Sequence, residues 1–333
     1  MKRDPFQKIL IIKPSSLGDI IDALPAVGSI RKQYPSACIS WLVKSEWGSL
    51  LNGHPFIDEV IAAPFAWRGI SRLIGAVRRP FDLVVDLQGL LRSALLGAAT
   101  GAPVRIGFAS AREGASRFYT DRVTIPERTV HAVDRYREIA RALGCDVSRI
   151  DFGIPISRES AAGIDRLLSG VGFSPSDRFI AIHPTARWES KKWMPTRFAD
   201  LADWLIREKR NPIIFVGSKG EREEVEQIVR RMKQPAINVA GETTLSELAE
   251  LIRRAECFIC NDSGPMHLAA AIGTPVVALF GPTDPSKIGP YGAGHKIIRK
   301  EISCAGCHRD RCVRDNECMR AISVEDVIET IER

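Results

Sequence analysis

Short, continuous runs of apolar residues alternate along the whole chain with longer stretches in which apolar residues recur every three or four positions. The runs KILIIK (8–13), CISWLV (38–43) and FDLVVDLQG (81–89) are typical of strands buried on both faces. The stretches 20–34 and 130–143 have the spacing of amphipathic helices. Strands that alternate with helices predict a parallel sheet covered by helices on both faces.

The alternation pauses at 151–177, where prolines and glycines surround one helix, and then starts again. Strands are expected in the second half at 179–184, 212–217, 236–241, 257–262 and 275–281, with helices at 195–209, 221–232, 244–255 and 265–272. The length of 333 residues also favours more than one domain. We therefore predict an α/β protein with two Rossmann-like, doubly wound domains facing a cleft, at 1–155 and 156–320, followed by a terminal helix at 321–333.

Composition narrows the class of protein. Hydrophobic residues make up 45% and charged residues 26% of the chain, as in ordinary globular proteins. The apolar runs are far shorter than the roughly 18 residues of a membrane span, and the N-terminal run is too short for a secretory signal. These features predict a cytoplasmic protein.

The charge indicates an anionic partner, although solubility alone could also account for it. The net charge is +7 and the pI about 9.1, which suits a substrate, membrane surface or nucleic acid that carries phosphates or carboxylates. Because the Lys and Arg residues are scattered rather than clustered, nucleic acid is the least favoured of these partners.

Four polar stretches follow predicted strands: KPSSLGD (13–19), HPTARWESKKW (183–193), GSKGERE (217–223) and NDSGPMH (261–267). In open parallel sheets, ligands bind beyond the carboxyl ends of strands, where helix N-termini favour anions. The last stretch can equally be a well-capped helix start, with Asp262 or Ser263 as the cap. Neither the dinucleotide fingerprint nor the P-loop motif is present.

Asp19 lies in the first predicted turn of a helix. An acid there usually complements the helix dipole. If it faces a cleft it can instead act as a general base, with cationic help to the leaving group from Arg187, Lys191 and Lys192.

Three segments, KPSSLGDIIDALPAV, DLQGLLRSAL and NDSGPMHLAAAIGTPVVALFGPTDP, together resemble glycosyltransferase family 9, the ADP-heptose:lipopolysaccharide heptosyltransferases. The resemblance runs in order from about residue 8 to 295. Two more segments, GFASAREGASRFY (107–119) and HAVDRYREIA (131–140), are similar to heptosyltransferase I. The resemblance implies a GT-B fold and metal-independent, inverting transfer of heptose from ADP-heptose to the Kdo-lipid A inner core of lipopolysaccharide.

The resemblance also implies roles for individual residues. Asp19 would be the general base, and Lys191 would stabilise the leaving group. The residues implied on the acceptor side are Lys13, Ser16, Arg112 and His131. The residues implied on the donor side are Thr185, Arg187, Lys192, Glu221, Asp262, Ser263, Gly264 and His267. The segment between Arg187 and the lysine pair is one residue longer than expected, so the choice between Lys191 and Lys192 is left open.

The eight cysteines fall into two groups. Cys38, Cys145, Cys257 and Cys260 have apolar neighbours and are expected in the core. The other four lie in a charged, glycine-containing segment: Cys304, Cys307, Cys312 and Cys318. In a reducing compartment such a group favours a structural zinc or iron site over free thiols or disulfides.

Two alternatives to the leading hypothesis are kept. One is a family 9 transferase with another acceptor, either heptosyltransferase II-like or protein-modifying. The other is a metal-binding regulatory or nucleic-acid-binding protein, which the scattered charges do not favour. Contact with the cytoplasmic face of the inner membrane is expected to be peripheral and electrostatic.

Overall fold

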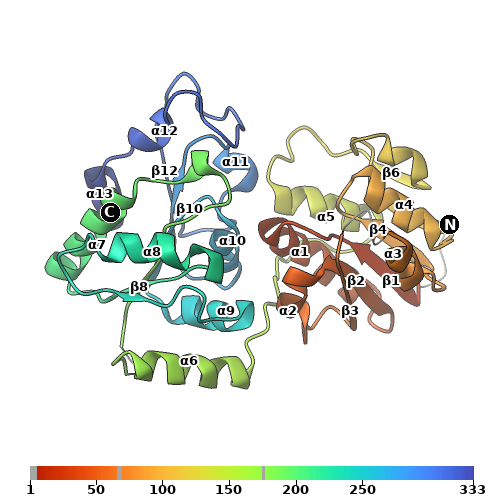
Figure 1. Ribbon diagram of the computed structural model, residues 1–333. Helices are drawn as coiled ribbons and strands as arrows, with labels where there is room; N and C mark the ends of the chain where they lie inside the picture. The colour runs from red at the N-terminus through yellow and green to blue at the C-terminus, as the bar shows by residue number, and fades with distance from the viewer. Residues whose placement is uncertain (1–5, 66–69, 175–176) are drawn as a thin grey trace. The chain divides into compact units, whose positions relative to one another are not determined.

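The computed structural model describes residues 6–65, 70–174 and 177–333. The chain forms two compact units, Met1–Pro155 and Ile156–Arg333. In each unit, helices pack against a parallel sheet (Figure 1).

The described residues of the first unit form a six-stranded parallel sheet in the order β3-β2-β1-β4-β5-β6. The strands are β1 (Lys8–Ile12), β2 (Cys38–Lys44), β3 (Glu59–Ala63), β4 (Leu83–Asp86), β5 (Val104–Phe108) and β6 (Asp121–Val123). The helices are α1 (Leu17–Gln33), α2 (Gly48–Leu51), α3 (Ile70–Val77), α4 (Leu91–Ala99) and α5 (Ala132–Ala142).

The described part of the second unit also forms a six-stranded parallel sheet, in the order β12-β11-β10-β7-β8-β9. The strands are β7 (Ile180–His183), β8 (Ile213–Phe215), β9 (Ile237–Asn238), β10 (Cys257–Asn261), β11 (Val276–Phe280) and β12 (Lys296–Arg299). The helices are α6 (Arg158–Gly170), α7 (Pro195–Lys209), α8 (Arg222–Val229), α9 (Leu245–Arg254), α10 (Gly264–Ala271), α11 (Pro285–Ile288), α12 (Glu317–Arg320) and α13 (Val324–Glu332).

The central strands of both sheets are buried among apolar side chains of neighbouring elements. Leu10 and Ile12 of β1 are fully buried and pack with Leu42 and Val84 from the two neighbouring strands. In the second unit, Ile182 of β7 packs with Phe215 and Ile259 in the same way. Burial on both faces requires continuous apolar runs, which is the pattern that the sequence contains.

The two sheets have the same topology when the second is read from β9 to β12. In each, the strand order reverses once, between β1 and β4 in the first unit and between β7 and β10 in the second. Such a switch point is where open α/β sheets bind ligands. The segments that follow β1 and β7 are therefore expected to carry ligand-binding residues.

The predicted class, two doubly wound α/β sheets in succession, is confirmed. Several elements were not predicted: α3, the three-residue strand β6 and the edge strand β12. The prediction that Cys38 lies in the core is wrong, because this first residue of β2 is exposed. Within the described residues, no helix is both long and apolar enough to cross a membrane.

Candidate functional site

Asp19 lies at the carboxyl edge of the first sheet, three residues after the N-cap of α1. The chain leaves β1 at Ile12, and Ser16 is the N-cap of the helix. The Asp19 Oδ2 atom accepts hydrogen bonds from the Ser16 backbone N–H at 3.0 Å and from the Ser16 hydroxyl at 2.7 Å. The loop and the helix start therefore hold one oxygen of this carboxylate.

The other oxygen of Asp19 meets a buried lysine and a buried tyrosine. Oδ1 lies 3.5 Å from Lys13 Nζ and accepts a hydrogen bond of 3.2 Å from the Tyr136 hydroxyl of α5. The Lys13 side chain is 4% exposed, whereas that of Asp19 is 44% exposed. Lys13 Nζ also lies 5.1 Å from the centre of the Tyr136 ring.

This geometry suits a carboxylate that receives a proton from a bound molecule. Hydrogen bonds and a nearby positive charge favour the ionised form of an acid. The surrounding groups are Ser16 at the start of α1, Tyr136 of α5 and the buried Lys13. The carboxylate is nevertheless half-exposed, so a bound molecule can reach it. Because Lys13 is buried, it can hold Asp19 in place but offers little surface to a large acceptor.

Arg112 lies in the segment that follows β5, and His131 lies directly before α5. Arg112 is exposed, and its backbone N–H donates to the carbonyl of Gly89, which follows β4. His131 is the N-cap of α5, and its Nδ1 atom accepts a hydrogen bond of 3.2 Å from Val133 N–H. Their contact with an acceptor stays a prediction.

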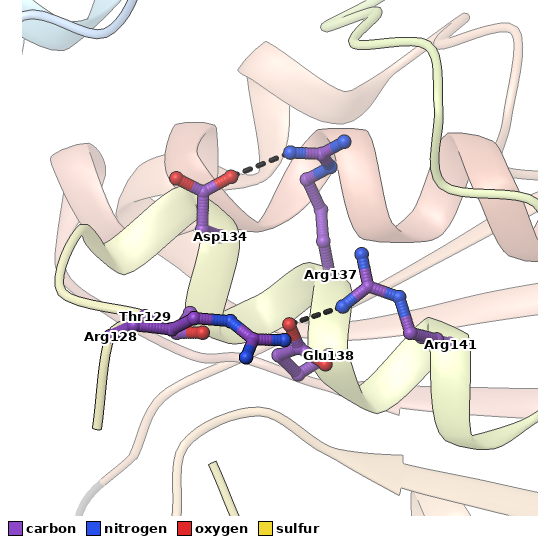
Figure 2. A pocket seen from close by; sticks show the side chains of 6 residues that line it. All are labelled: Arg128, Thr129, Asp134, Arg137, Glu138 and Arg141. Carbon is purple, nitrogen blue, oxygen red and sulfur yellow. Dashed lines mark hydrogen bonds and ion pairs between the residues drawn. The ribbon is translucent and has the colours of Figure 1, made fainter. Parts of the chain in front are cut away.

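A cavity of about 270 Å³ lies on α5 and the loop before it. Its lining residues are Arg128, Thr129, Asp134, Arg137, Glu138 and Arg141. Figure 2 shows that two of its three arginines turn toward acids of the same helix, Arg137 toward Asp134 and Arg141 toward Glu138. The helical lining positions recur every three or four residues, a face of α5 that excludes Tyr136. This cavity is therefore not built around Asp19.

In the second unit, Lys191 and Asp262 form a close ion pair. Lys191 Nζ lies 2.7 Å from Asp262 Oδ2, and the two side chains are 15% and 4% exposed. The Thr283 hydroxyl donates to the same oxygen at 2.6 Å. Lys191 Nζ also lies 4.6 Å from the centre of the Trp188 ring. The segments after β7, β10 and β11 thus converge on one buried carboxylate.

Lys192 points to a different set of partners. Its Nζ atom donates to Glu189 at 2.7 Å and to Glu224 of α8 at 2.9 Å. Burial alone would lower the pKa of Lys192, but the two carboxylates raise it above its usual value. The structure thus brings Lys191, and not Lys192, to Asp262.

A second polar group lies beside this pair, around the buried His183. The Thr185 hydroxyl, which is fully buried, donates to Glu221 and lies 3.2 Å from His183 Nε2. His183 Nδ1 lies 3.2 Å from the Ser263 hydroxyl. Burial opposes ionisation of Glu221, but His183 and hydrogen bonds from Ser218 and Thr185 bring its pKa well below the usual value. The group connects the ends of β7, β8 and β10.

The N-terminus of α10 also lies at this edge. Ser263 is its N-cap, but in the described structure its hydroxyl faces His183 and makes no capping bond. Pro265 has no N–H and the Met266 N–H donates to the Ser263 carbonyl at 3.2 Å, so the Gly264 N–H is the first-turn donor that points to an anion site here. His267, one turn further, is 8% exposed, and Arg187 is exposed on the loop after β7.

The cysteine segment follows β12. Cys304, Cys307, Cys312 and Cys318 are all free thiols, and burial followed by the charges of the other three raises the pKa of Cys318. Among the described residues, no group of three or more His, Cys, Asp or Glu side chains is arranged to hold a metal. The metal site stays a prediction.

Sequence reasoning missed three side chains that shape these groups: Tyr136, His183 and Thr283. All three lie in segments already noted: Tyr136 in HAVDRYREIA, His183 at the start of HPTARWESKKW, and Thr283 in FGPTDP. His183 also ends a buried apolar strand, and a polar residue at such a position is the signal that could have singled it out.

Comparisons with known proteins show the family and the fold. Residues 70–317 match glycosyltransferase family 9 (heptosyltransferase). Lipopolysaccharide heptosyltransferase 1 of Pseudomonas aeruginosa is 29% identical, covering 92% of this chain and 87% of its own. The structure of a family 9 glycosyl transferase from Veillonella parvula superposes with a TM-score of 0.87 and 27% identity, covering 98% and 96% of the two chains.

A third similar structure is E. coli heptosyltransferase WaaC with ADP-2-deoxy-2-fluoro heptose. Its TM-score is 0.75 at 22% identity, over 98% of this chain and 99% of that one. This likeness supports the predicted GT-B fold class.

Proposed function

The chain belongs to glycosyltransferase family 9, the heptosyltransferases, and from this premise we propose that it transfers heptose from ADP-heptose to the Kdo-lipid A inner core of lipopolysaccharide. The name of the Pseudomonas relative supports the lipopolysaccharide acceptor. The ligand of the WaaC structure supports the donor. The net charge of +7 suits a phosphorylated, carboxylated acceptor.

In the proposed reaction Asp19 is the general base. As the acceptor hydroxyl oxygen attacks the anomeric carbon of heptose, its proton passes to the Asp19 carboxylate. The bond between that carbon and the diphosphate oxygen breaks, and ADP leaves with the electron pair from the opposite face. The configuration at the anomeric carbon is therefore inverted.

The second unit would hold the donor. Lys191 would stabilise the negative charge that develops on the departing diphosphate, together with the Gly264 N–H at the start of α10. Asp262 would accept hydrogen bonds from the sugar hydroxyls, and Glu221 would accept from the ribose. Thr185, Arg187, Ser263 and His267 would complete the donor site. The hydrogen bonds of Lys192 to Glu189 and Glu224 support a proposal in which Lys191, and not Lys192, meets the diphosphate.

One observation carries the proposal: a half-exposed carboxylate at the switch point of the first sheet, held by donors from three directions. A purely dipole-complementing surface acid has no need of a buried lysine and a buried tyrosine. Arg112 and His131 would lie on the acceptor side. We also propose a peripheral, electrostatic contact with the cytoplasmic face of the inner membrane.

The test is acceptor-dependent release of ADP from ADP-heptose, with mass spectrometry of the product. Kdo-lipid A is compared with the same acceptor already carrying one heptose. We expect the unmodified acceptor to be the substrate. Turnover only with the heptosylated acceptor would replace this acceptor with that of a heptosyltransferase II, and no turnover with either would overturn the proposed function.

We propose in addition that the segment Cys304–Cys318 binds a structural zinc or iron ion. Four thiols within fifteen residues, and the influence of three of them on the pKa of Cys318, support this proposal. Purified protein should contain about one metal ion per chain by elemental analysis. The paired substitution Cys304→Ser with Cys307→Ser should remove it, whereas Cys38→Ser should not. Metal-free wild type would contradict the proposal.

A further inference from the structure

We propose that Tyr136 is a positioning residue for Asp19, whose hydroxyl fixes the plane of the catalytic carboxylate and stabilises its ionised form. This inference rests on the proposed role of Asp19 as the base. Tyr136 is 7% exposed, so it acts through Asp19 and does not reach the acceptor itself.

The hydrogen bonds divide between the two carboxylate oxygens. Both donors of Ser16 bind Oδ2. Oδ1 lies 3.5 Å from Lys13 Nζ, an ion pair that sets no single orientation, and accepts the hydrogen bond of 3.2 Å from the Tyr136 hydroxyl of α5. A directional donor on each oxygen, from two different elements, fixes the plane of the carboxylate.

The tyrosine is itself held in place from several sides. The centre of its ring lies 6.0 Å from the ring centre of Phe108 of β5. The same ring centre lies 5.1 Å from Lys13 Nζ. Helix α5, which carries it, packs along α1, which carries Asp19. A ring fixed in this way can position a carboxylate more accurately than a flexible surface side chain.

The surrounding charges keep the Tyr136 hydroxyl protonated and so able to donate. Burial, then the carboxylates of Asp19 and Asp22, raises the pKa of Tyr136 well above its usual value, while Arg135 acts in the opposite direction. Lys13 also faces the ring, with its Nζ atom 5.1 Å from the ring centre. Tyr136 therefore remains a donor at neutral and acidic pH.

Loss of this donor has a consequence that a merely structural role would not have. A hydrogen bond to the ionised form of an acid lowers its pKa, so its removal makes protonation easier. In Tyr136→Phe, the acid limb of the pH profile of kcat/KM should move to higher pH by about one unit. The value of kcat at its optimum should fall about tenfold because the carboxylate is less well oriented.

The first unit contains a matched control. The Tyr119 hydroxyl donates to Oδ2 of the buried Asp86 at 2.7 Å, so Tyr119→Phe removes the same atom from the same kind of bond. Asp86 is only 1% exposed and also accepts from Ser93, Gln88 and Gly89. Tyr119→Phe should lower thermal stability and leave the acid limb where it is in wild type.

The experiment compares pH profiles of kcat/KM and kcat for wild type, Tyr136→Phe and Tyr119→Phe. A shift confined to Tyr136→Phe supports the proposal. An unshifted Tyr136→Phe profile, or an equal shift in Tyr119→Phe, overturns it. Failure of the proposed function is a separate result, since wild type would then show no acceptor-dependent release.

A second variant covers the case in which Tyr136→Phe does not fold, as judged by circular dichroism. Incorporation of 3-fluorotyrosine at position 136 retains the ring and makes the hydroxyl a stronger donor. It should move the acid limb to lower pH. An acid limb that stays in place, or moves to higher pH, overturns the proposal.

Discussion

Each unit contains one lysine–aspartate pair at the switch point of its sheet, and the two pairs are exposed in opposite senses. In the first unit the lysine is buried and the acid is accessible, at 4% for Lys13 and 44% for Asp19. In the second unit the acid is the more buried member, at 4% for Asp262 and 15% for Lys191. One scaffold thus presents a carboxylate in one copy and an ammonium in the other.

The two pairs also differ in their closeness. The nitrogen–oxygen distance is 3.5 Å for Lys13 and Asp19 but 2.7 Å for Lys191 and Asp262. A looser pair leaves the acid free to exchange a proton, whereas a tighter pair orients a cation. The more exposed member of each pair is the group that the proposed reaction needs, an acid for the acceptor hydroxyl and a cation for the diphosphate.

We expect a large effect when Lys191 of the second pair is substituted. Lys191→Ala should reduce transfer by about a hundredfold, because the charge on the departing diphosphate loses its closest cation. Donor affinity, measured by calorimetry with ADP, should fall as well. Lys192→Ala is the matched control, since its partners are Glu189 and Glu224, and it should change transfer less than about twofold. Equal losses in both variants would contradict the assignment.

A smaller effect should appear in the stability of the first unit as the pH falls. His54 Nε2–H donates to Phe152 O at 3.0 Å, and Nδ1 accepts from Phe56 N–H at 3.3 Å, so the ring is held neutral. Burial lowers the pKa of His54 from 6.5 to about 4. The unfolded chain takes up this proton below pH 6.5, and the folded unit does so only near pH 4.

The free energy of unfolding should therefore decrease by about 3 kcal/mol between pH 6.5 and pH 4 on account of His54. Urea titrations of wild type and His54→Asn across this range isolate the contribution, because other titrating groups are common to both. If His54→Asn loses as much stability as wild type in this range, the role of the neutral ring is wrong.

The smallest effect distinguishes two helix starts within the second unit. Thr244 caps α9, with its hydroxyl accepting from Glu247 N–H at 3.2 Å, whereas the Ser263 hydroxyl faces His183. Thr244→Ala should lower stability by about 1 kcal/mol without affecting ADP binding. Ser263→Ala should do the reverse, weakening ADP binding with little loss of stability. Thermal unfolding and calorimetry on both variants would show whether this division fails.

Much of the fold could be predicted from the sequence because the central strands are buried on both faces. The run FIAIHP corresponds to β7, and the predicted helix 195–209 is α7 with the same bounds. Edge strands are harder to predict, because β6 has only three residues and β12 is half-buried, so neither needs a continuous apolar run. The helix α3 was within reach, since Ile70, Leu73, Ile74 and Val77 have helical spacing.

Candidate site residues could be selected from the sequence where they follow a strand along the chain, as Asp19, Thr185 and Asp262 do. The partners that orient them come from other segments, and no local pattern indicates that Tyr136 meets Asp19 or that Thr283 meets Asp262. The sequence left the choice between Lys191 and Lys192 open for the same reason. Glu224, which binds Lys192, is distant from it in the sequence but adjacent in the fold.

The most direct test of the whole account measures donor binding and transfer separately in Asp19→Ala. If the first unit supplies the base and the second unit holds the donor, the variant should bind ADP-heptose within about twofold of wild type. Its transfer to Kdo-lipid A should fall by roughly a hundredfold or more, the scale of a lost general base. Transfer that survives the substitution, or donor binding that disappears with it, would contradict the division of labour between the two units.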